Sequence, residues 1–190
     1  MTDLIKLTSG VLSTQECDTI IDFFEDNKER QYAGLAGDNL SPVPSAKIDT
    51  ELGIWHRELI EDSRLFPVKA ALWTCCNKYK EAYPFLNSIL PWYFFESVKI
   101  QKYKPNEAYF VEHCENDGQA NHTGRRMIAA MVYLNTVTDG GQTYFPTQKR
   151  SITPEVGSVL MWPAYWTHPH HGVPSPSQDK YIITGWYVFN

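Results

Sequence analysis

Histidine and carboxylate side chains gather at two places in the second half of the sequence. The segments EHCEND (112–117) and WTHPHHG (166–172) hold four of the six histidines. In the first segment, His113 and Glu115 stand two residues apart at the end of an apolar run. Residues i and i+2 of an extended chain project to the same side, so both side chains can converge on one ion while Cys114 points away. This spacing indicates a candidate metal site.

A third ligand is available in the second histidine cluster. One imidazole from residues 166–172, added to His113 and Glu115, supplies two nitrogens and one carboxylate oxygen on one face of an ion. With the opposite positions open, such a ligand set is the facial triad typical of non-haem Fe(II) oxygenases.

The last predicted strand carries a lysine among apolar residues. In KYIITGWYVF (180–189), strand alternation places Lys180, Ile182, Thr184 and Trp186 on one face. A lysine on such a face either reaches an edge or lies beside an anion, because an unpaired buried ammonium is costly. If this face lines a metal-binding barrel, the anion could be a ligand carboxylate.

The first half of the chain is predicted to be mainly helical. Ser13 and Glu16 form a capping-box pattern ahead of apolar residues at helical spacing, which predicts a helix over 14–29. Residues 57–81 also have a helical pattern, divided by Pro67. The intervening residues 33–53 are rich in Gly, Pro and Ser, which predicts a long loop and a candidate lid.

The second half reads as short strands separated by turn signals. The predicted strands include FFESVKIQKY (94–103), AYFVEH (108–113), RRMIAAMVYLN (125–135), QTYF (142–145) and the final strand. The basic pairs Arg125-Arg126 and Lys149-Arg150 are expected in solvated turns. We therefore predict an α+β, mainly β fold: a jelly roll with N-terminal helices packed on one sheet. One domain would span 1–190, with helical support and loop in 1–90 and the jelly-roll core with the metal site in 91–190.

Several sequence motifs occur in an order typical of one enzyme family. They are YKPNEAY (103–109) ahead of His113, YLN (133–135) followed by GGQTYFP (140–146), PEVGSVLMWP (154–163), and HHGVP (170–174) with Lys180 ten residues after His170. With these motifs, residues 98–190 resemble the Fe(II)- and 2-oxoglutarate-dependent oxygenases, specifically the prolyl 4-hydroxylase-like family. The resemblance implies that the jelly roll is a double-stranded β-helix.

The resemblance also implies a set of iron ligands, namely His113, Glu115 and His170. Most members carry Asp where this chain has Glu115, one methylene longer, so Asp117 remains an alternative if the chain turns sharply. His168 shares a strand face with His170 and is the alternative histidine. The spacing in sequence to Pro174 and Lys180 favours His170 as the second histidine ligand.

The same resemblance assigns the residues that hold the cosubstrate. Lys180 would pair with the distal carboxylate of 2-oxoglutarate, helped by the phenol of Tyr133. Tyr103 would hydrogen-bond near the metal-bound end of the cosubstrate, as a catalytic and cofactor-binding residue. Thr184 and Trp186 would line the pocket.

The implied reaction is the hydroxylation of a C–H bond, with release of succinate and CO2. The cofactors would be Fe(II), 2-oxoglutarate and dioxygen, with ascorbate as a further candidate. A peptidyl proline is the favoured substrate, and a small molecule is the other class considered. The alternative reading is a cupin-like metal-binding protein or sensor that uses the same ligands without 2-oxoglutarate.

Composition and charge exclude other function classes. The 190 residues carry 17 Lys+Arg and 22 Asp+Glu, a net charge of −5, which disfavours nucleic acid as a partner. No window reaches the roughly 18 apolar residues of a membrane span. The N-terminus lacks the features of a signal peptide, and four cysteines do not form a disulfide framework. We therefore expect a cytoplasmic protein.

Overall fold

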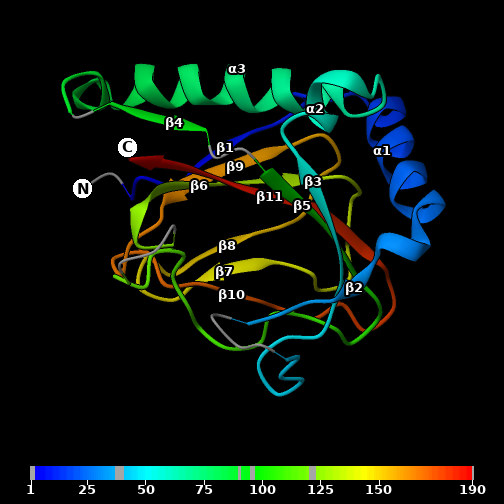
Figure 1. Ribbon diagram of the computed structural model, residues 1–190. Coiled ribbons are helices and arrows are strands. Elements are labelled where there is room, and N and C mark those ends of the chain that lie inside the picture. Colours follow the sequence, from blue (N-terminus) through cyan, green and yellow to red (C-terminus); the bar gives the residue numbers. More distant parts are fainter. Residues whose placement is uncertain (1–2, 37–40, 90, 95–96, 120–122, 190) are drawn as a thin grey trace.

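Three layers make up the structure. The computed structural model describes residues 3–36, 41–89, 91–94, 97–119 and 123–189. Figure 1 shows a large sheet with the helices on one side and a small sheet on the other. The expectation of a mainly β fold with helices packed on one sheet is confirmed.

The large sheet has the order β1-β9-β6-β11-β5-β3-β2, and β4 also pairs with β11. Its strands are β1 (Lys6–Thr8), β2 (Tyr32–Ala33), β3 (Thr50–Trp55), β4 (Trp92–Phe94), β5 (Ser97–Tyr103), β6 (Arg126–Tyr133), β9 (Val159–Pro163) and β11 (Lys180–Phe189). All of the pairs are antiparallel. The long strand β11 lies between β6 and β5, and every second residue of β11 faces the inner core: Ile182, Trp186 and Val188.

The small sheet closes the other side. It consists of β10 (His171–Gly172), β7 (Thr143–Phe145) and β8 (Arg150–Ile152), in the order β10-β7-β8. Thr143 pairs with Gly172, so the strand after the GG motif lies beside the second histidine cluster. The two sheets thereby place both histidine clusters between them.

The helices are α1 (Thr14–Asp26), α2 (Glu58–Glu61) and α3 (Phe66–Ala82), with 3-10 turns at Lys28–Arg30, Pro84–Asn87 and Thr123–Arg125. The capping box is present: the Glu16 N–H donates to the Ser13 hydroxyl at 3.2 Å, and Glu16 accepts from the Ser13 N–H at 2.8 Å. Pro67 lies in the first turn of α3, where a missing N–H costs no helical hydrogen bond. The predicted division of the second helical segment is confirmed. No helix in the described residues is long and apolar enough to cross a bilayer.

Strand alternation gives the large sheet two apolar faces. On β6, Ile128 and Val132 pack against the helices, whereas Met131 and Tyr133 face the small sheet. The second face forms a separate core with Phe145 and other residues of the small sheet. Such alternation is expected where both faces of a strand are covered. The inner face is the one that can carry a site.

Two expectations about individual elements are wrong. Residues 108–113 form no strand, because they make only isolated bridges, from Tyr109 to Lys47 and from His113 to His170. The predicted loop over 33–53 ends early, because its last residues belong to β3, which pairs with β5 and β2. Residues 37–40 of that loop lie outside the described part of the chain.

Candidate metal centre

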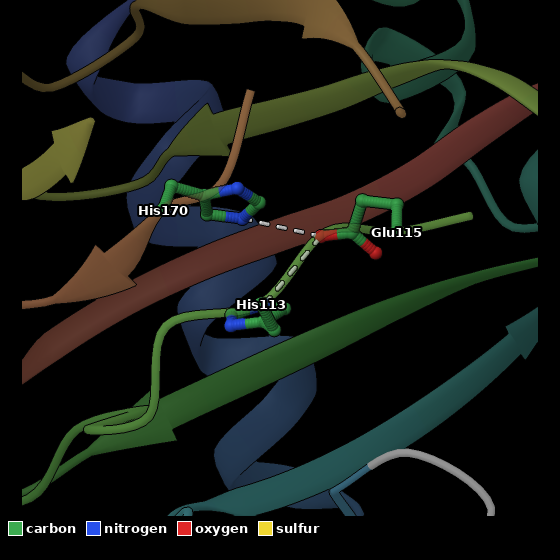
Figure 2. A group of neighbouring side chains, drawn as sticks. All are labelled: His113, Glu115 and His170. Atoms are coloured by element: carbon green, nitrogen blue, oxygen red, sulfur yellow. Dashed lines mark ion pairs between the residues drawn. The ribbon is translucent and has the colours of Figure 1, made fainter. Parts of the chain in front are cut away.

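Three side chains converge between the sheets: His113, Glu115 and His170 (Figure 2). Glu115 Oε1 lies 3.3 Å from His170 Nε2 and 3.8 Å from His113 Nε2. Adjacent ligands of an octahedral ion with bonds of about 2.1 Å lie about 3 Å apart. The two nitrogens and the oxygen therefore have the chemistry and nearly the spacing of three ligands on one face of an ion.

The backbone brings the two distant histidines together. The His113 N–H donates to the His170 carbonyl at 3.0 Å, and the His170 N–H donates to the His113 carbonyl at 2.9 Å. The ring of Tyr109 stacks on His113 with a centroid distance of 3.6 Å, and the ring of Trp162 meets His170 edge-on at 4.9 Å. Both imidazoles are thus held in place by backbone pairing and by aromatic neighbours.

Hydrogen bonds leave the correct nitrogens available to a metal. His113 Nδ1 lies 2.9 Å from the Val111 carbonyl, and His170 Nδ1 lies 3.2 Å from the His168 carbonyl. A carbonyl only accepts, so each Nδ1 carries the proton and each Nε2 presents a lone pair. Carbonyls of this kind commonly fix the tautomer of metal-binding histidines. The donor set therefore fits a ferrous ion.

The protonation states of the site also suit a metal. Burial lowers the pKa of His113 to about 4, and the neighbouring His170 acts in the same direction. Burial alone would raise the pKa of Glu115, but nearby positive charge, including the Arg126 guanidinium 3.6 Å from Oε2, holds the pKa below its usual range. A neutral imidazole and an ionised carboxylate are the forms that bind metals.

The alternative ligands lie outside the three-residue group. Asp117 Oδ1 accepts from the Thr123 hydroxyl at 2.7 Å and from the Gln119 N–H at 3.0 Å. Both ring nitrogens of His168 are used elsewhere, because Nδ1 lies 2.9 Å from the Thr167 hydroxyl and Nε2 lies 2.8 Å from the Asp3 carbonyl. Neither side chain belongs to the group whose ligand atoms all lie within 4.8 Å of one another.

A cavity of about 530 Å³ connects the three side chains to Lys180. The Lys180 ammonium is buried and donates to the Gly141 carbonyl at 2.8 Å. Burial lowers the pKa of Lys180 to about 8. Gly141 has a φ of +78°, and a Cβ there would lie 2.6 Å from a methyl group of Val137, so the GG motif supplies a backbone acceptor that other residues could not.

The remaining predicted cosubstrate residues surround the path between Lys180 and the metal ligands. Tyr103 is paired with Lys180 in the sheet, and Tyr103, Thr184 and Trp186 line the cavity. The Thr184 hydroxyl is buried and has no partner within the described residues, so it is available to a bound molecule. Tyr133 does not line the cavity. Its hydroxyl instead hydrogen-bonds with the Thr143 hydroxyl, which does, at 2.8 Å.

Sequence reasoning missed a polar wall of the cavity. Glu51 is fully buried and accepts from Lys47, from Lys99 at 2.8 Å and from Gln101 at 2.8 Å. Glu51 alternates with the buried Leu52 and Ile54 on β3, a short period-2 signal at the edge of the predicted loop. That alternation was the signal in the sequence that could have predicted a strand at this position.

The placement of Arg126 in a solvated turn is also wrong. Arg126 opens β6, its side chain is only 15% exposed, and its guanidinium lies over the Trp186 ring at 3.8 Å from the centroid. Arg125, by contrast, donates to the Phe189 carbonyl near the surface. Consecutive residues of a strand project to opposite faces, so the two side chains of a basic dipeptide at the start of a strand lie in different environments.

Comparison with known proteins agrees with this centre. Residues 98–188 match the sequence model of the 2OG-Fe(II) oxygenase superfamily. A protein of Acanthamoeba polyphaga mimivirus named as a prolyl 4-hydroxylase is 28% identical over 107 residues, covering 48% of this chain and 44% of that protein. The chain spans about 44% of the length of the curated relatives it matches.

Solved structures show the same fold. The viral collagen prolyl hydroxylase of Paramecium Bursaria Chlorella virus-1, solved with 2OG, has a TM-score of 0.71 at 21% identity, over 98% of this chain and 97% of that chain. A prolyl hydroxylase of Trichoplax adhaerens, solved with a hypoxia inducible factor peptide fragment, has a TM-score of 0.72 at 18% identity, over 98% and 84%.

The fold and the site together define a jelly-roll-type protein with a two-histidine, one-carboxylate centre. Residues 98–188 thus match the 2OG-Fe(II) oxygenase superfamily, and the chain is similar to prolyl 4-hydroxylases, in agreement with the motifs in the sequence.

Proposed function

We propose that this protein is an Fe(II)- and 2-oxoglutarate-dependent dioxygenase that hydroxylates a C–H bond of a peptidyl proline. One observation carries the proposal: His113, Glu115 and His170 line the same cavity as the buried ammonium of Lys180. A cation at the far end of a cavity that begins at a metal site suits a dicarboxylate chelated by the metal. A cupin-like protein without cosubstrate would have no use for Lys180.

The chain's residues bind and orient the cosubstrate in this proposal. His113, Glu115 and His170 hold the ion and leave its opposite positions open. Lys180 pairs with the distal carboxylate, which supplies an anion to a buried ammonium whose hydrogen bond goes to the neutral Gly141 carbonyl. When bound, Fe(II) and 2-oxoglutarate activate dioxygen for hydroxylation and yield succinate and CO2.

Other cavity residues complete the cosubstrate site. The Tyr103 hydroxyl would hydrogen-bond near the metal-bound end. The buried Thr184 hydroxyl, which has no partner among the described residues, would face the molecule between its two ends. Trp186 would form part of the pocket wall. Tyr133 would act through its hydrogen bond with Thr143.

The substrate is proposed to be a peptide. The cavity of about 530 Å³ is also lined by Ser97, Lys99 and Gln101, and it gives more room than a five-carbon diacid fills. The relatives are named as prolyl hydroxylases, and one of the similar structures holds a peptide fragment. A peptidyl proline is therefore the first substrate to test, with small molecules as the comparison.

The proposal extends to the architecture and setting of the protein. Residues 1–190 would form one domain whose two sheets are the halves of a double-stranded β-helix. All four cysteines are free thiols, and a ferrous centre also needs a reducing environment, which the cytoplasm supplies. Ascorbate would serve to keep the iron ferrous.

An activity assay tests the proposal. Protein, Fe(II), 2-oxoglutarate and a proline-rich peptide should yield succinate and a peptide heavier by one oxygen atom, and His113→Ala and Lys180→Ala should abolish or sharply reduce both products. Unchanged turnover in the two variants would refute the assignment. Failure of 2-oxoglutarate to raise the thermal stability of the metal-loaded protein would favour the cupin-like alternative.

A further inference from the structure

The two oxygens of Glu115 have different surroundings. Oε1 faces His113 and His170, and Oε2 points away from them (Figure 2). Oε2 accepts from the indole N–H of Trp186 at 2.8 Å and lies 3.6 Å from Nη1 of Arg126. The carboxylate is therefore engaged on both sides, by the candidate metal ligands on one side and by a hydrogen-bond donor and a cation on the other.

The side chains of Trp186 and Arg126 are themselves fixed. The Arg126 guanidinium stacks on the Trp186 ring at 3.8 Å from the centroid, and Nη1 also donates to the Glu115 carbonyl at 3.2 Å. The side-chain amide of Asn116 donates to the carbonyls of Gly124 and Arg126, at 2.9 and 2.8 Å. These bonds connect the backbone next to Glu115 to the start of β6, so Glu115 and Arg126 are held in fixed relative positions.

This arrangement matters because the ligand is a glutamate. Glu has one more rotatable bond than Asp and loses more conformational entropy when it is fixed in place. An unrestrained carboxylate can also bind a metal through both oxygens, and the second would take a coordination position. A ligand held at Oε2 offers the metal only Oε1.

We propose that Trp186 and Arg126 form a carboxylate clamp that keeps Glu115 a one-oxygen ligand and preserves the open positions of the metal for cosubstrate and dioxygen. The proposal rests on the proposed function, because it takes Glu115 to be a metal ligand. It gives Trp186 a role beyond lining the pocket, and it makes both residues positioning residues.

The clamp can be tested with Co(II) in place of iron. Trp186→Phe removes the indole N–H but keeps an aromatic ring for Arg126, and Arg126→Lys keeps the charge but loses the planar guanidinium. Trp73→Phe, at an exposed tryptophan on α3, is the matched control. Each protein is titrated with Co(II), its visible absorption spectrum is recorded, and the metal-loaded protein is then titrated with 2-oxoglutarate.

We expect about tenfold weaker Co(II) binding in both clamp variants, since loss of a partner of a metal ligand usually costs 10–100-fold. Their Co(II) spectra should change, because a second carboxylate oxygen alters the coordination, and their affinity for 2-oxoglutarate should fall. Trp73→Phe should match the wild type. A merely structural role would lower the melting temperature of the metal-free variants and leave the Co(II) spectrum unchanged.

Two outcomes would overturn the clamp. Co(II) affinity within twofold of the wild type and an unaltered spectrum in both variants would refute the clamp alone and leave the metal centre standing. Wild-type protein that binds no Co(II) would refute the metal centre, and the clamp with it.

Discussion

Lys180 is expected to make the affinity for 2-oxoglutarate depend on pH. Its ammonium is buried, and burial lowers the pKa of Lys180 to about 8 in the ligand-free protein. The charged form predominates below that pKa, and the neutral form above it. A dicarboxylate needs the charged form, so its binding should weaken as the pH rises through 8.

The size of the effect follows from the pKa. With a pKa of about 8, roughly nine tenths of Lys180 is charged at pH 7 and roughly one tenth at pH 9. The dissociation constant of 2-oxoglutarate should therefore rise about tenfold between these values. At pH 7, loss of the charge-assisted hydrogen bond in Lys180→Met should cost about 1.5–3 kcal/mol, or about 10–150-fold in affinity.

Calorimetric titration of the Co(II)-loaded protein between pH 6.5 and 9.5 measures this profile. Lys180→Met controls for other groups that titrate in the range, and it should bind weakly with little dependence on pH. Lys180→Arg keeps its charge over the whole pH range, so its affinity for 2-oxoglutarate should not change near pH 8. A flat wild-type profile, or the same tenfold change in Lys180→Met, would refute the assignment of Lys180 as the cosubstrate's cation.

The structure supports two further predictions. Glu51→Ala should lower the free energy of unfolding by about 1.5–3 kcal/mol in denaturant titrations, because it removes the buried carboxylate that accepts from Lys47, Lys99 and Gln101, whereas Glu58→Ala, at a more exposed ion pair, should cost at most about 1 kcal/mol. Equal losses in the two variants would contradict this role of the polar wall. Gly141→Ala should weaken 2-oxoglutarate binding and destabilise the fold, because the new methyl group clashes and displaces the carbonyl that holds the lysine. Gly10→Ala, also at a positive φ but in open space, should leave 2-oxoglutarate binding unchanged, and a normal dissociation constant in Gly141→Ala would contradict the argument.

Local signals in the sequence predicted local structure well. The capping box at Ser13 and Glu16 defines the start of α1 by bonds between neighbouring residues, and Pro67 marks the start of α3. The pair His113 and Glu115 was visible because two residues of extended spacing direct side chains to one side, wherever the rest of the chain lies.

The errors concern partners that are distant in the sequence. Residues 108–113 have strand-like composition, but a strand needs a continuous neighbour, and this segment makes only single bridges. Strand alternation separates the side chains of Arg125 and Arg126, but the contact of Arg126 with Trp186, sixty residues later, is not visible in any local pattern. The convergence of His170 on His113 likewise comes from backbone pairing between segments that are distant in the sequence. In the sequence, only the order of the family's motifs predicted it.

A crystal structure with Mn(II) and 2-oxoglutarate tests the central claim most directly. We predict one anomalous scattering peak bound by Nε2 of His113, Oε1 of Glu115 and Nε2 of His170, with 2-oxoglutarate extending from it to Lys180. A peak bound instead by Asp117 or His168, or 2-oxoglutarate located away from Lys180, would contradict the account.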